Sequence, residues 1–385
     1  MRKYILIFFL ILVLIFTALV AGAGYFVGDY FVNFTLKRGN DRNPHGPPQA
    51  YSTILGVKKS PEANKPNYVS EDWQMTSQDG LKLQATHFEP RKSSNRWVIL
   101  VHGYGGNQSY VWNLARAYLH NGYQVLTPDL RAAGKSEGQY ITLGILESKD
   151  IVDWSKYIIK KDPSAQIVLH GVSMGAATVM LAEGGQLPTN IKAVVEDCGY
   201  TSAYQMLEME LVKTIKNIPP EPILWVANLM TKVRTGVYFS DATPIKAVQH
   251  ANLPTLFIHG NTDDLVPFAM MQQLFDSSTS PDKEELTIEN ATHAMSYVVN
   301  PRQYFGTVFT FLNKHLSQNK LKNAQLYERK NAQKVLTLIL RQLIRWQRQG
   351  VTKKTGCDRT TWSISTCLLQ LQRSICRLSG CRFIS

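Results

Sequence analysis

The pentapeptide at residues 171–175 constrains the fold of this chain more than any other feature. It reads Gly-Val-Ser-Met-Gly and lies between the apolar run Gln166–His170, which is typical of a buried strand, and the small-residue run Ala176–Ala182, which is typical of a helix. A serine on so tight a strand-to-helix turn has a strained backbone that exposes its hydroxyl. Side chains at the flanking positions would collide with the neighbouring strand and helix, which favours glycine there. The sequence therefore predicts a nucleophile at Ser173.

A glycine-rich turn earlier in the chain supplies groups that would stabilise a substrate oxygen. The apolar run Trp97–Val101 predicts a buried strand, and it leads into His-Gly-Tyr-Gly-Gly at residues 102–106. Backbone amides in such a turn approach a ligand closely, and the helix that follows the serine favours negative charge at its N-terminus. We therefore expect the backbone amides of Tyr104 and Met174 to form an oxyanion hole.

A carboxylate and a histidine follow the serine in the chain. A strand predicted from Thr255 delivers Asp263 just past its end, and a short strand predicted from Leu286 is followed by a loop that carries His293. A serine hydroxyl is a poor nucleophile without a base, so the histidine would take its proton while the aspartate fixes the imidazole tautomer. The order Ser173, Asp263, His293 differs from the orders of chymotrypsin and subtilisin.

These segments together resemble the α/β-hydrolase superfamily over about residues 68–316. The matching motifs include Asp129-Leu130-Arg131, the Gly-Lys-Ser-Glu-Gly run at 134–138, and His-Gly at 259–260 through Val-Pro at 266–267. The resemblance implies a mostly parallel, eight-stranded-type sheet with helices on both faces and a helical lid. Within the superfamily the chain is similar to bacterial membrane-anchored or extracellular members, near the serine aminopeptidase-like and acyl-esterase-like branches. One departure is the sequence Arg-Ala-Ala-Gly at 131–134, where the family often has Arg-Gly-His-Gly, in a loop that the resemblance makes structural.

Alternatives remain open for each member of the predicted triad. Asp197 follows another strand-like run and Asp264 is adjacent in the chain, but Asp263 matches the position of the acid in the family. Of the nine histidines, His293 follows the acid and lies on a predicted loop, whereas His102, His170 and His259 precede glycines at strand ends and are typical of core or loop histidines. A purely structural serine or histidine is the competing interpretation. No cluster of potential ligands has the spacing of a metal site, so we expect neither a metal nor a cofactor.

The N-terminus predicts a membrane anchor. After Met-Arg-Lys, residues 4–28 are uncharged and dominated by Ile, Leu, Phe and Val. This stretch is long enough to cross a hydrocarbon core of about 30 Å as a helix. The two basic residues favour a cytoplasmic N-terminus, which places the catalytic domain outside the cytoplasm, at the cell membrane. The alternative is a cleaved signal peptide and a secreted enzyme, because Ala21-Gly22-Ala23 resembles a cleavage site.

The remaining chain divides by composition. We expect a transmembrane anchor at 1–28, a linker at 29–67, a hydrolase domain at 68–317 with a lid insertion at about 200–245, and a basic tail at 318–385. Apolar residues of the lid would line an acyl pocket or pack the lid on the body.

The basic charge of the chain is local. The tail from residue 318 carries a net charge of +12 out of +13 for the whole chain, so the catalytic body lacks the signature of nucleic-acid binding. Residues 335–346 are cationic and apolar and would suit a membrane surface. Four of the five cysteines (Cys357, Cys367, Cys376 and Cys381) lie farther along and would pair outside the cell, but the composition favours a disordered tail.

The sequence thus predicts a membrane-anchored serine hydrolase that cleaves esters of a small or medium apolar acyl group through an acyl-enzyme. An aminopeptidase-like hydrolase is the first alternative, and it would need an acidic lid residue such as Glu208, Glu210 or Glu221 to hold the substrate amine. An inactive membrane-tethered binding module is the second, and the complete set of three catalytic residues disfavours it. The expected partners are an acyl ester or short peptide and the membrane, and no nucleic acid.

Overall fold

The structure is a computed structural model, and it describes residues 2–38 and 65–316. Most of the predicted linker lies outside these residues, and so does the whole basic tail with its four cysteines. The boundaries predicted for these two segments therefore stay predictions.

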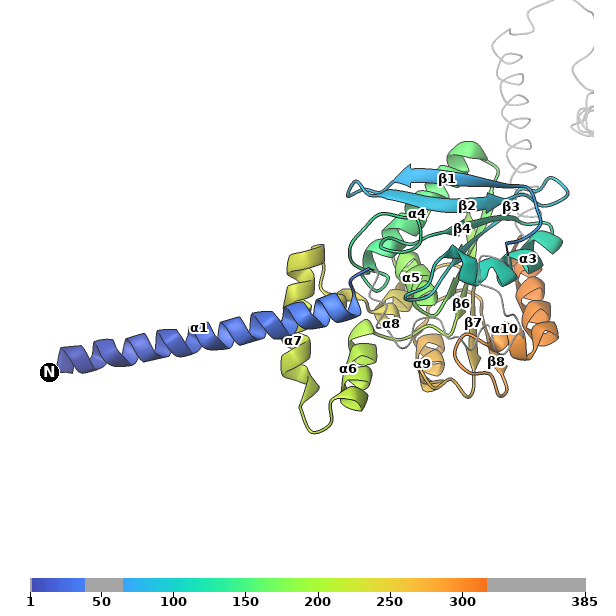
Figure 1. The fold of residues 1–385 in the computed structure, drawn as a ribbon. Coiled ribbons are helices and arrows are strands. Elements are labelled where there is room, and N and C mark those ends of the chain that lie inside the picture. Colours follow the sequence, from blue (N-terminus) through green and yellow to red (C-terminus); the bar gives the residue numbers. More distant parts are fainter. Residues whose placement is uncertain (1, 39–64, 317–385) are drawn as a thin grey trace, which may run out of the picture. The chain divides into compact units, whose positions relative to one another are not determined.

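One eight-stranded sheet forms the centre of the hydrolase domain (Figure 1). The strands run in the spatial order β1-β2-β4-β3-β5-β6-β7-β8, and β2 is antiparallel to both of its neighbours while β3 to β8 are parallel. This arrangement confirms the predicted mostly parallel sheet. The strands are β1 (Ser70–Thr76), β2 (Lys82–Phe88), β3 (Arg96–Val101), β4 (Gln124–Pro128), β5 (Gln166–Val172), β6 (Ile191–Asp197), β7 (Thr255–Gly260) and β8 (Lys283–Ile288).

Helices cover both faces of this sheet (Figure 1). The helices of the described residues are α1 (Arg2–Thr35), α3 (Trp112–His120), α4 (Ile145–Lys161), α5 (Met174–Glu183), α6 (Ala203–Thr214), α7 (Pro220–Thr235), α8 (Pro244–Ala247), α9 (Ala269–Ser277), α10 (Ser296–Val299) and a last helix at 301–316. Most of α1 projects away from the sheet (Figure 1). Short 3-10 turns occupy Gln108–Val111, Phe239–Asp241 and Val248–His250.

The central strands are buried on both faces, which explains why they read as continuous apolar runs. Successive side chains of a strand point to opposite faces, and on β3 this alternation divides the core in two. Ile99 belongs to an apolar cluster that contains Trp154 of α4, whereas its neighbour Val98 belongs to a second cluster that contains Tyr118 of α3. All four of these side chains are almost completely buried. Each face of the sheet is therefore sealed by its own layer of helices.

The first two strands form a hairpin that turns around Asp79-Gly80. Ser70 of β1 pairs with Phe88 of β2, and Thr76 pairs with Lys82 at the turn. Gly80 has φ +90°, which an L side chain rarely adopts, so a glycine at this position lets the chain reverse tightly.

Helix α1 is longer than the predicted span. It continues seven residues beyond residue 28 and ends at Thr35. Its segment Lys3–Thr35 is long and apolar enough to cross a membrane, with a mean hydropathy of 3.1 in its most apolar window, none of which is buried. The far end differs, because Val32 and Leu36 are fully buried in the domain and the carbonyl of Leu36 accepts a hydrogen bond of 2.8 Å from the amide of Ile141. Part of the segment read as a linker thus belongs to the folded body.

Two helices, α6 and α7, lie within the insertion predicted between β6 and β7. Pro220 at the first position of α7 has no amide to leave unpaired, and Gly236 ends the helix with φ +83°. Helix α7 packs against α1. We call these two helices and the turn between them the α6–α7 insertion.

Candidate active site

Ser173 lies at the turn between β5 and α5 with φ 58° and ψ −120°, a strained conformation for a residue with a side chain. A Cβ atom on Gly171 would lie 2.0 Å from the carbonyl oxygen of Gly175, and one on Gly175 would lie 2.1 Å from the carbonyl oxygen of Val101. The backbone amide of Ser173 donates a hydrogen bond of 2.8 Å to the carbonyl of Asp197. Close packing of β5, α5 and β3 therefore requires both glycines.

The three side chains predicted to form a triad meet in one hydrogen-bonded row. Ser173 Oγ lies 2.8 Å from His293 Nε2, and His293 Nδ1 lies 2.8 Å from Asp263 Oδ2. They follow β5, β8 and β7, and the carboxyl ends of parallel strands meet at one edge of a sheet. A carboxylate accepts from Nδ1–H, which leaves Nε2 free to accept the serine proton.

Asp263 is held as a carboxylate by several donors. Its side chain is fully buried, and Oδ1 accepts hydrogen bonds from the amides of Leu265 at 3.0 Å and Val266 at 2.9 Å. The second oxygen lies 3.2 Å from Nε2 of His259 as well as beside His293. Burial opposes its ionisation, but the hydrogen bonds from His259 and His293 outweigh this and hold the pKa of Asp263 well below its usual range.

The two alternative acids are placed differently. Asp197 is fully buried at the end of β6 and accepts a hydrogen bond of 2.8 Å from the hydroxyl of Tyr304, and burial raises its pKa to about 6. Asp264 is exposed to solvent. The carboxylate that hydrogen-bonds His293 is that of Asp263.

The predicted oxyanion turn lies directly against the serine. A Cβ atom on Gly103 would approach Cβ of Ser173 to 3.2 Å, so the backbone before Tyr104 passes close to the nucleophile. His102 fixes this turn, because its Nε2 accepts from the amide of Leu130 at 3.1 Å and its Nδ1 donates to the carbonyl of Gly103 at 2.8 Å. Met174, whose amide is the second predicted donor, is the first residue of α5. The role of these amides stays a prediction.

The end of α1 reaches the same turn, which the sequence did not indicate. The hydroxyl of Tyr104 donates a hydrogen bond to the backbone carbonyl of Thr35, and burial raises the pKa of this tyrosine to about 12. Arg38 donates to the backbone carbonyls of Gly134 and Ser136. The Tyr104 contact joins residues 69 positions apart, and the contact between Arg38 and Ser136 joins residues 98 positions apart. A local sequence pattern therefore could not predict them.

A pair of buried ionisable side chains behind the triad, His259 and Glu196, was also missed. The sequence assigned His259 to the core, but it lies against Asp263 and near Glu196, and these acids raise its pKa although burial opposes the charge. Glu196 is fully buried at the end of β6, where its Oε2 accepts a hydrogen bond of 2.9 Å from the amide of Gly199, and burial raises its pKa to about 8. The spacing of four residues between His259 and Asp263 was the available signal.

One group of potential metal ligands occurs in the described residues, and it overlaps the triad. A ligand atom of Cys198 lies within 4.8 Å of those of Asp263 and His293. Burial raises the pKa of the Cys198 thiol well above its ordinary value, so the thiolate that a metal prefers is disfavoured. The histidine and aspartate are engaged with each other, and a metal would have to break that hydrogen bond.

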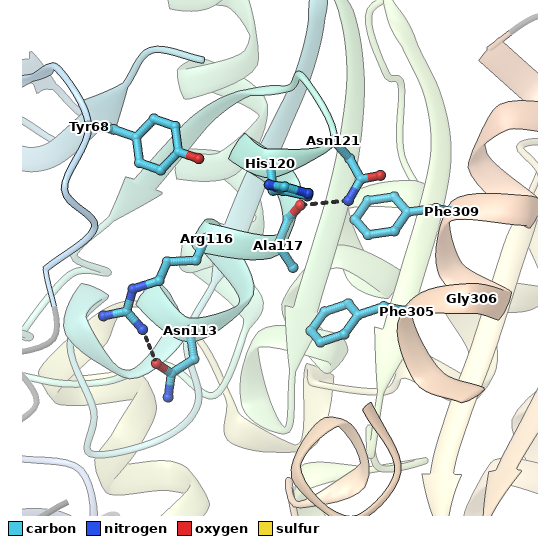
Figure 2. Close-up of a pocket in the computed structure, with 9 residues that line it drawn as sticks. All are labelled: Tyr68, Asn113, Arg116, Ala117, His120, Asn121, Phe305, Gly306 and Phe309. Atoms are coloured by element: carbon cyan, nitrogen blue, oxygen red, sulfur yellow. Dashed lines mark hydrogen bonds between the residues drawn. The ribbon is translucent and has the colours of Figure 1, made fainter. Parts of the chain in front are cut away.

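A surface groove of the domain lies away from these residues. It is lined by α3 and the helix at 301–316, and Figure 2 shows Phe305 and Phe309 on one side and Tyr68 on the other. Its lining contains none of the three triad residues.

Comparisons with known proteins agree with this fold. A family model described as the alpha/beta hydrolase fold matches residues 96–221. The uncharacterized protein YqkD of Bacillus subtilis is 28% identical over 235 residues, which cover 61% of this chain and 76% of YqkD. The uncharacterized protein YfhR of Escherichia coli K12 is 25% identical over 230 residues, which cover 58% of this chain and 73% of YfhR.

The solved structure of the esterase Pf2001 of Pyrococcus furiosus is similar in fold. It aligns with a TM-score of 0.55 and 23% identity, over 67% of this chain and 95% of that one. The family match, the sheet order and the serine turn together show that the chain has the α/β-hydrolase fold.

Proposed function

We propose that this protein is a serine hydrolase that acts through an acyl-enzyme, with Ser173 as nucleophile, His293 as general base and acid, and Asp263 as the residue that orients the base. The observation that carries the proposal is the continuous row of two 2.8 Å hydrogen bonds from Ser173 Oγ through the imidazole to the aspartate, which starts on a strained turn. A serine that only packed against its neighbours would not need this row.

The proposed reaction proceeds in two transfers. Ser173 Oγ attacks the acyl carbon while its proton moves to His293 Nε2, and the carbonyl oxygen becomes an anion facing the amides of Tyr104 and Met174. The anion collapses, the bond to the leaving oxygen breaks, and His293 returns the proton to the leaving alcohol. Water then repeats the sequence on the acyl-serine, which releases the acid and restores the hydroxyl.

We propose an ester with a small or medium apolar acyl group as the substrate. Tyr104 belongs to the predicted oxyanion turn, and Leu265 lies two residues after Asp263. Both side chains are half-buried and largely apolar, as are those of Met206 and Leu207 on α6. Esterase activity also has a precedent in the structurally similar Pf2001, although that likeness by itself shows only the fold.

We further propose that α1 is a single-pass anchor and that the catalytic domain lies outside the cytoplasm. Residues 4–20 of α1 are exposed on every face of the helix and are almost all apolar. The helix continues without a break through the predicted cleavage site at 21–23 and into the body, which supports an anchor over a cleaved signal. An intact mass that includes residues 1–20, measured on protein extracted from membranes, is expected. A mature chain that starts near residue 24 would contradict it.

Labelling with a fluorophosphonate probe tests the catalytic proposal. We expect the full chain in mild detergent to be labelled at Ser173, and labelling to be abolished in Ser173→Ala and reduced by at least about a thousandfold in His293→Ala. His250→Ala is the matched control, because this histidine is exposed and distant in the chain from the triad, and it should label like wild type. Undiminished labelling of Ser173→Ala would refute the assignment.

Substrate preference follows from the same preparation. p-Nitrophenyl esters of two to eight carbons, compared with aminoacyl anilides, should show kcat/KM values that favour the esters. Faster cleavage of the anilides would favour the peptidase alternative.

A further inference from the structure

Helix α7 exposes an apolar stripe that the catalytic proposal does not use. Trp225, Leu229 and Val233 have exposed fractions of 69%, 44% and 69%, and they recur every four residues, so they share one face of the helix. Ile218, in the turn before the helix, is 52% exposed. A contiguous row of large apolar side chains marks an interaction surface. We call these four residues the α7 stripe.

The opposite face of the same helix is already occupied. Leu224, Ala227 and Thr231 are buried against the rest of the domain. At 100° per residue, these three positions lie roughly opposite the stripe around the helix axis. Among residues 2–38 and 65–316, packing of α7 on its own domain therefore leaves the stripe uncovered.

A third side of α7 contacts α1. Side-chain atoms of Val226 lie 3.8 Å from the Cβ position of Gly24 and 2.8 Å from that of Gly28, and the guanidinium of Arg234 pairs with Asp29 at 2.5 Å. Before these contacts, α1 is exposed, and beyond them Val32 is fully buried in the body. Along α1, the residues that contact α7 therefore lie between the exposed apolar segment and the residues buried in the hydrolase domain. The face of α7 that points away from the body points toward that segment.

The length of α1 sets the level of the bilayer. The helix has 34 residues, and a hydrocarbon core of about 30 Å takes up only about 20 of them. Counted from Lys3, the span ends near Ala23, next to Gly24, whose Cβ position lies 3.8 Å from Val226 of α7. Tyr25, Phe26 and Tyr30 follow with exposed rings, as is typical of the interface between lipid and water.

We propose that the α7 stripe docks on the lipid bilayer that α1 crosses. The proposal rests on the anchor included in the proposed function. Tryptophan and leucine enter the boundary between headgroups and acyl chains when an amphipathic helix lies in the membrane plane.

The docking defines a class of substrate. The hydroxyl of Tyr104, in the predicted oxyanion turn, binds the carbonyl of Thr35, which lies 12 residues or about 18 Å along α1 from Ala23. The catalytic serine is therefore near the bilayer surface, within reach of esters that partition into it. The substrate is an amphiphilic ester taken from the membrane.

Quenching of tryptophan by brominated lipid tests the contact. The full chain is reconstituted into phosphatidylcholine and phosphatidylglycerol vesicles, with and without phosphatidylcholine brominated on the upper part of its acyl chains. Flotation first establishes insertion. The chain has seven tryptophans, so the signal of Trp225 is the difference between wild type and Trp225→Phe. We expect a quenched component in wild type that is absent from the variant.

Two second-site tryptophans in the Trp225→Phe background serve as matched controls. Leu229→Trp, one turn along the stripe, should restore the quenched component, and Lys156→Trp, at an exposed position of α4, should not. Equal quenching of wild type and Trp225→Phe overturns the docking, as does restoration by Lys156→Trp. A second copy of the chain covering the stripe would shield Trp225 and give the first of these results. Failure to float removes the anchor, and the docking with it.

Activity provides the second measurement. In the double variant Trp225→Ser/Leu229→Ser, turnover of p-nitrophenyl octanoate carried in vesicles should fall about tenfold, while turnover of dissolved p-nitrophenyl acetate stays within about twofold of wild type. Equal rates of wild type and the double variant on the vesicle ester overturn the substrate class. A wild type that cleaves neither ester refutes the proposed function, whatever the quenching shows.

Discussion

Helices α5 and α7 belong to the same domain and are both rich in apolar residues, but their surroundings are opposite. In α5, nine of the ten residues are buried, because the sheet lies on one side and α4 and α8 on the others. In α7, four residues are buried while Trp225 and Val233 are more than two thirds exposed. The comparison shows that the apolar composition of a helix predicts burial away from water. It does not predict whether protein or lipid surrounds the buried side chains.

The largest effect is expected at the start of α5. Gly175→Ala places a methyl group 2.1 Å from the carbonyl oxygen of Val101, and the two backbones cannot separate without moving β3 from α5. We expect a loss of more than about 4 kcal/mol in the free energy of unfolding, measured by chemical denaturation, and loss of fluorophosphonate labelling.

Gly306→Ala is the matched control for this substitution. Gly306 lies in the helix at 301–316, and its Cβ position has no neighbour within 4 Å. The alanine should raise stability by up to about 1 kcal/mol, because glycine is a poor helix former. Similar losses in both variants would show that close packing is not what requires glycine at the turn.

The next effect contrasts the two faces of α7. Leu224→Ala empties a fully buried position and should lower the free energy of unfolding by about 2–5 kcal/mol. Leu229→Ala removes an exposed side chain from the same helix and should change it by less than about 0.5 kcal/mol in detergent. Denaturation of the two variants side by side measures the difference. A large loss in Leu229→Ala would mean that the stripe packs on protein.

The third effect depends on pH and concerns the buried acid beneath α5. The folded protein raises the pKa of Glu196 from 4.5 to about 8, so it holds a proton that the unfolded chain releases. The resulting stabilisation is complete below about pH 4.5 and is lost as the pH rises through about 8. Glu196→Gln lacks this loss. Relative to wild type, the variant should gain about 4 kcal/mol between pH 5 and pH 9, because each unit of pKa difference is worth about 1.4 kcal/mol.

Thermal unfolding at pH 5, 7 and 9 measures this difference. Glu285→Gln, at an exposed position of β8, is the control and should follow wild type at all three values. Parallel curves for wild type and Glu196→Gln would mean that the buried carboxyl is neutralised in some other way.

The smallest effect concerns the loop that departs from the family pattern. Ala132 has φ 59°, a left-handed conformation in which alanine is strained, and it stands where the resembling family often has glycine. Ala132→Gly relieves this strain, which stabilises the folded state, but glycine also raises the conformational entropy of the unfolded chain. Because the two effects oppose each other, the free energy of unfolding should change by less than about 1 kcal/mol. Its neighbour Ala133 does not have positive φ, and Ala133→Gly should cost more. Denaturation that ranks the two variants in the reverse order would contradict the argument.

Much of the fold was predictable because its signals are local. The apolar runs of β3, β5 and β7, the hairpin around Gly80 and the glycines beside Ser173 all reflect constraints within a few residues. The chain order of the three triad residues was readable for the same reason, since each follows its own strand. The pattern alone did not fix which carboxylate faces the histidine, because Asp197 ends β6 and Asp263 follows the end of the neighbouring strand β7.

The features that pattern missed depend on contacts between distant segments. Nothing near Thr35 in the sequence indicates that its carbonyl binds Tyr104, and nothing near His259 indicates that Glu196 of the neighbouring strand lies close enough to raise its pKa. Likewise, the period of α7 shows apolar residues on several faces without showing which face the body covers.

By itself, the sequence determined the mostly parallel sheet, the strained serine turn and an apolar N-terminal helix, because strand burial, glycine at close approaches and hydropathy are written in short runs of residues. Only the tertiary structure decided that Asp263 is the acid that hydrogen-bonds His293, that α1 ends inside the body, and that one face of α7 stays uncovered. These three features depend on contacts between segments that are distant in the sequence. The burial and hydrogen bonding at such contacts follow from how whole helices and strands are arranged.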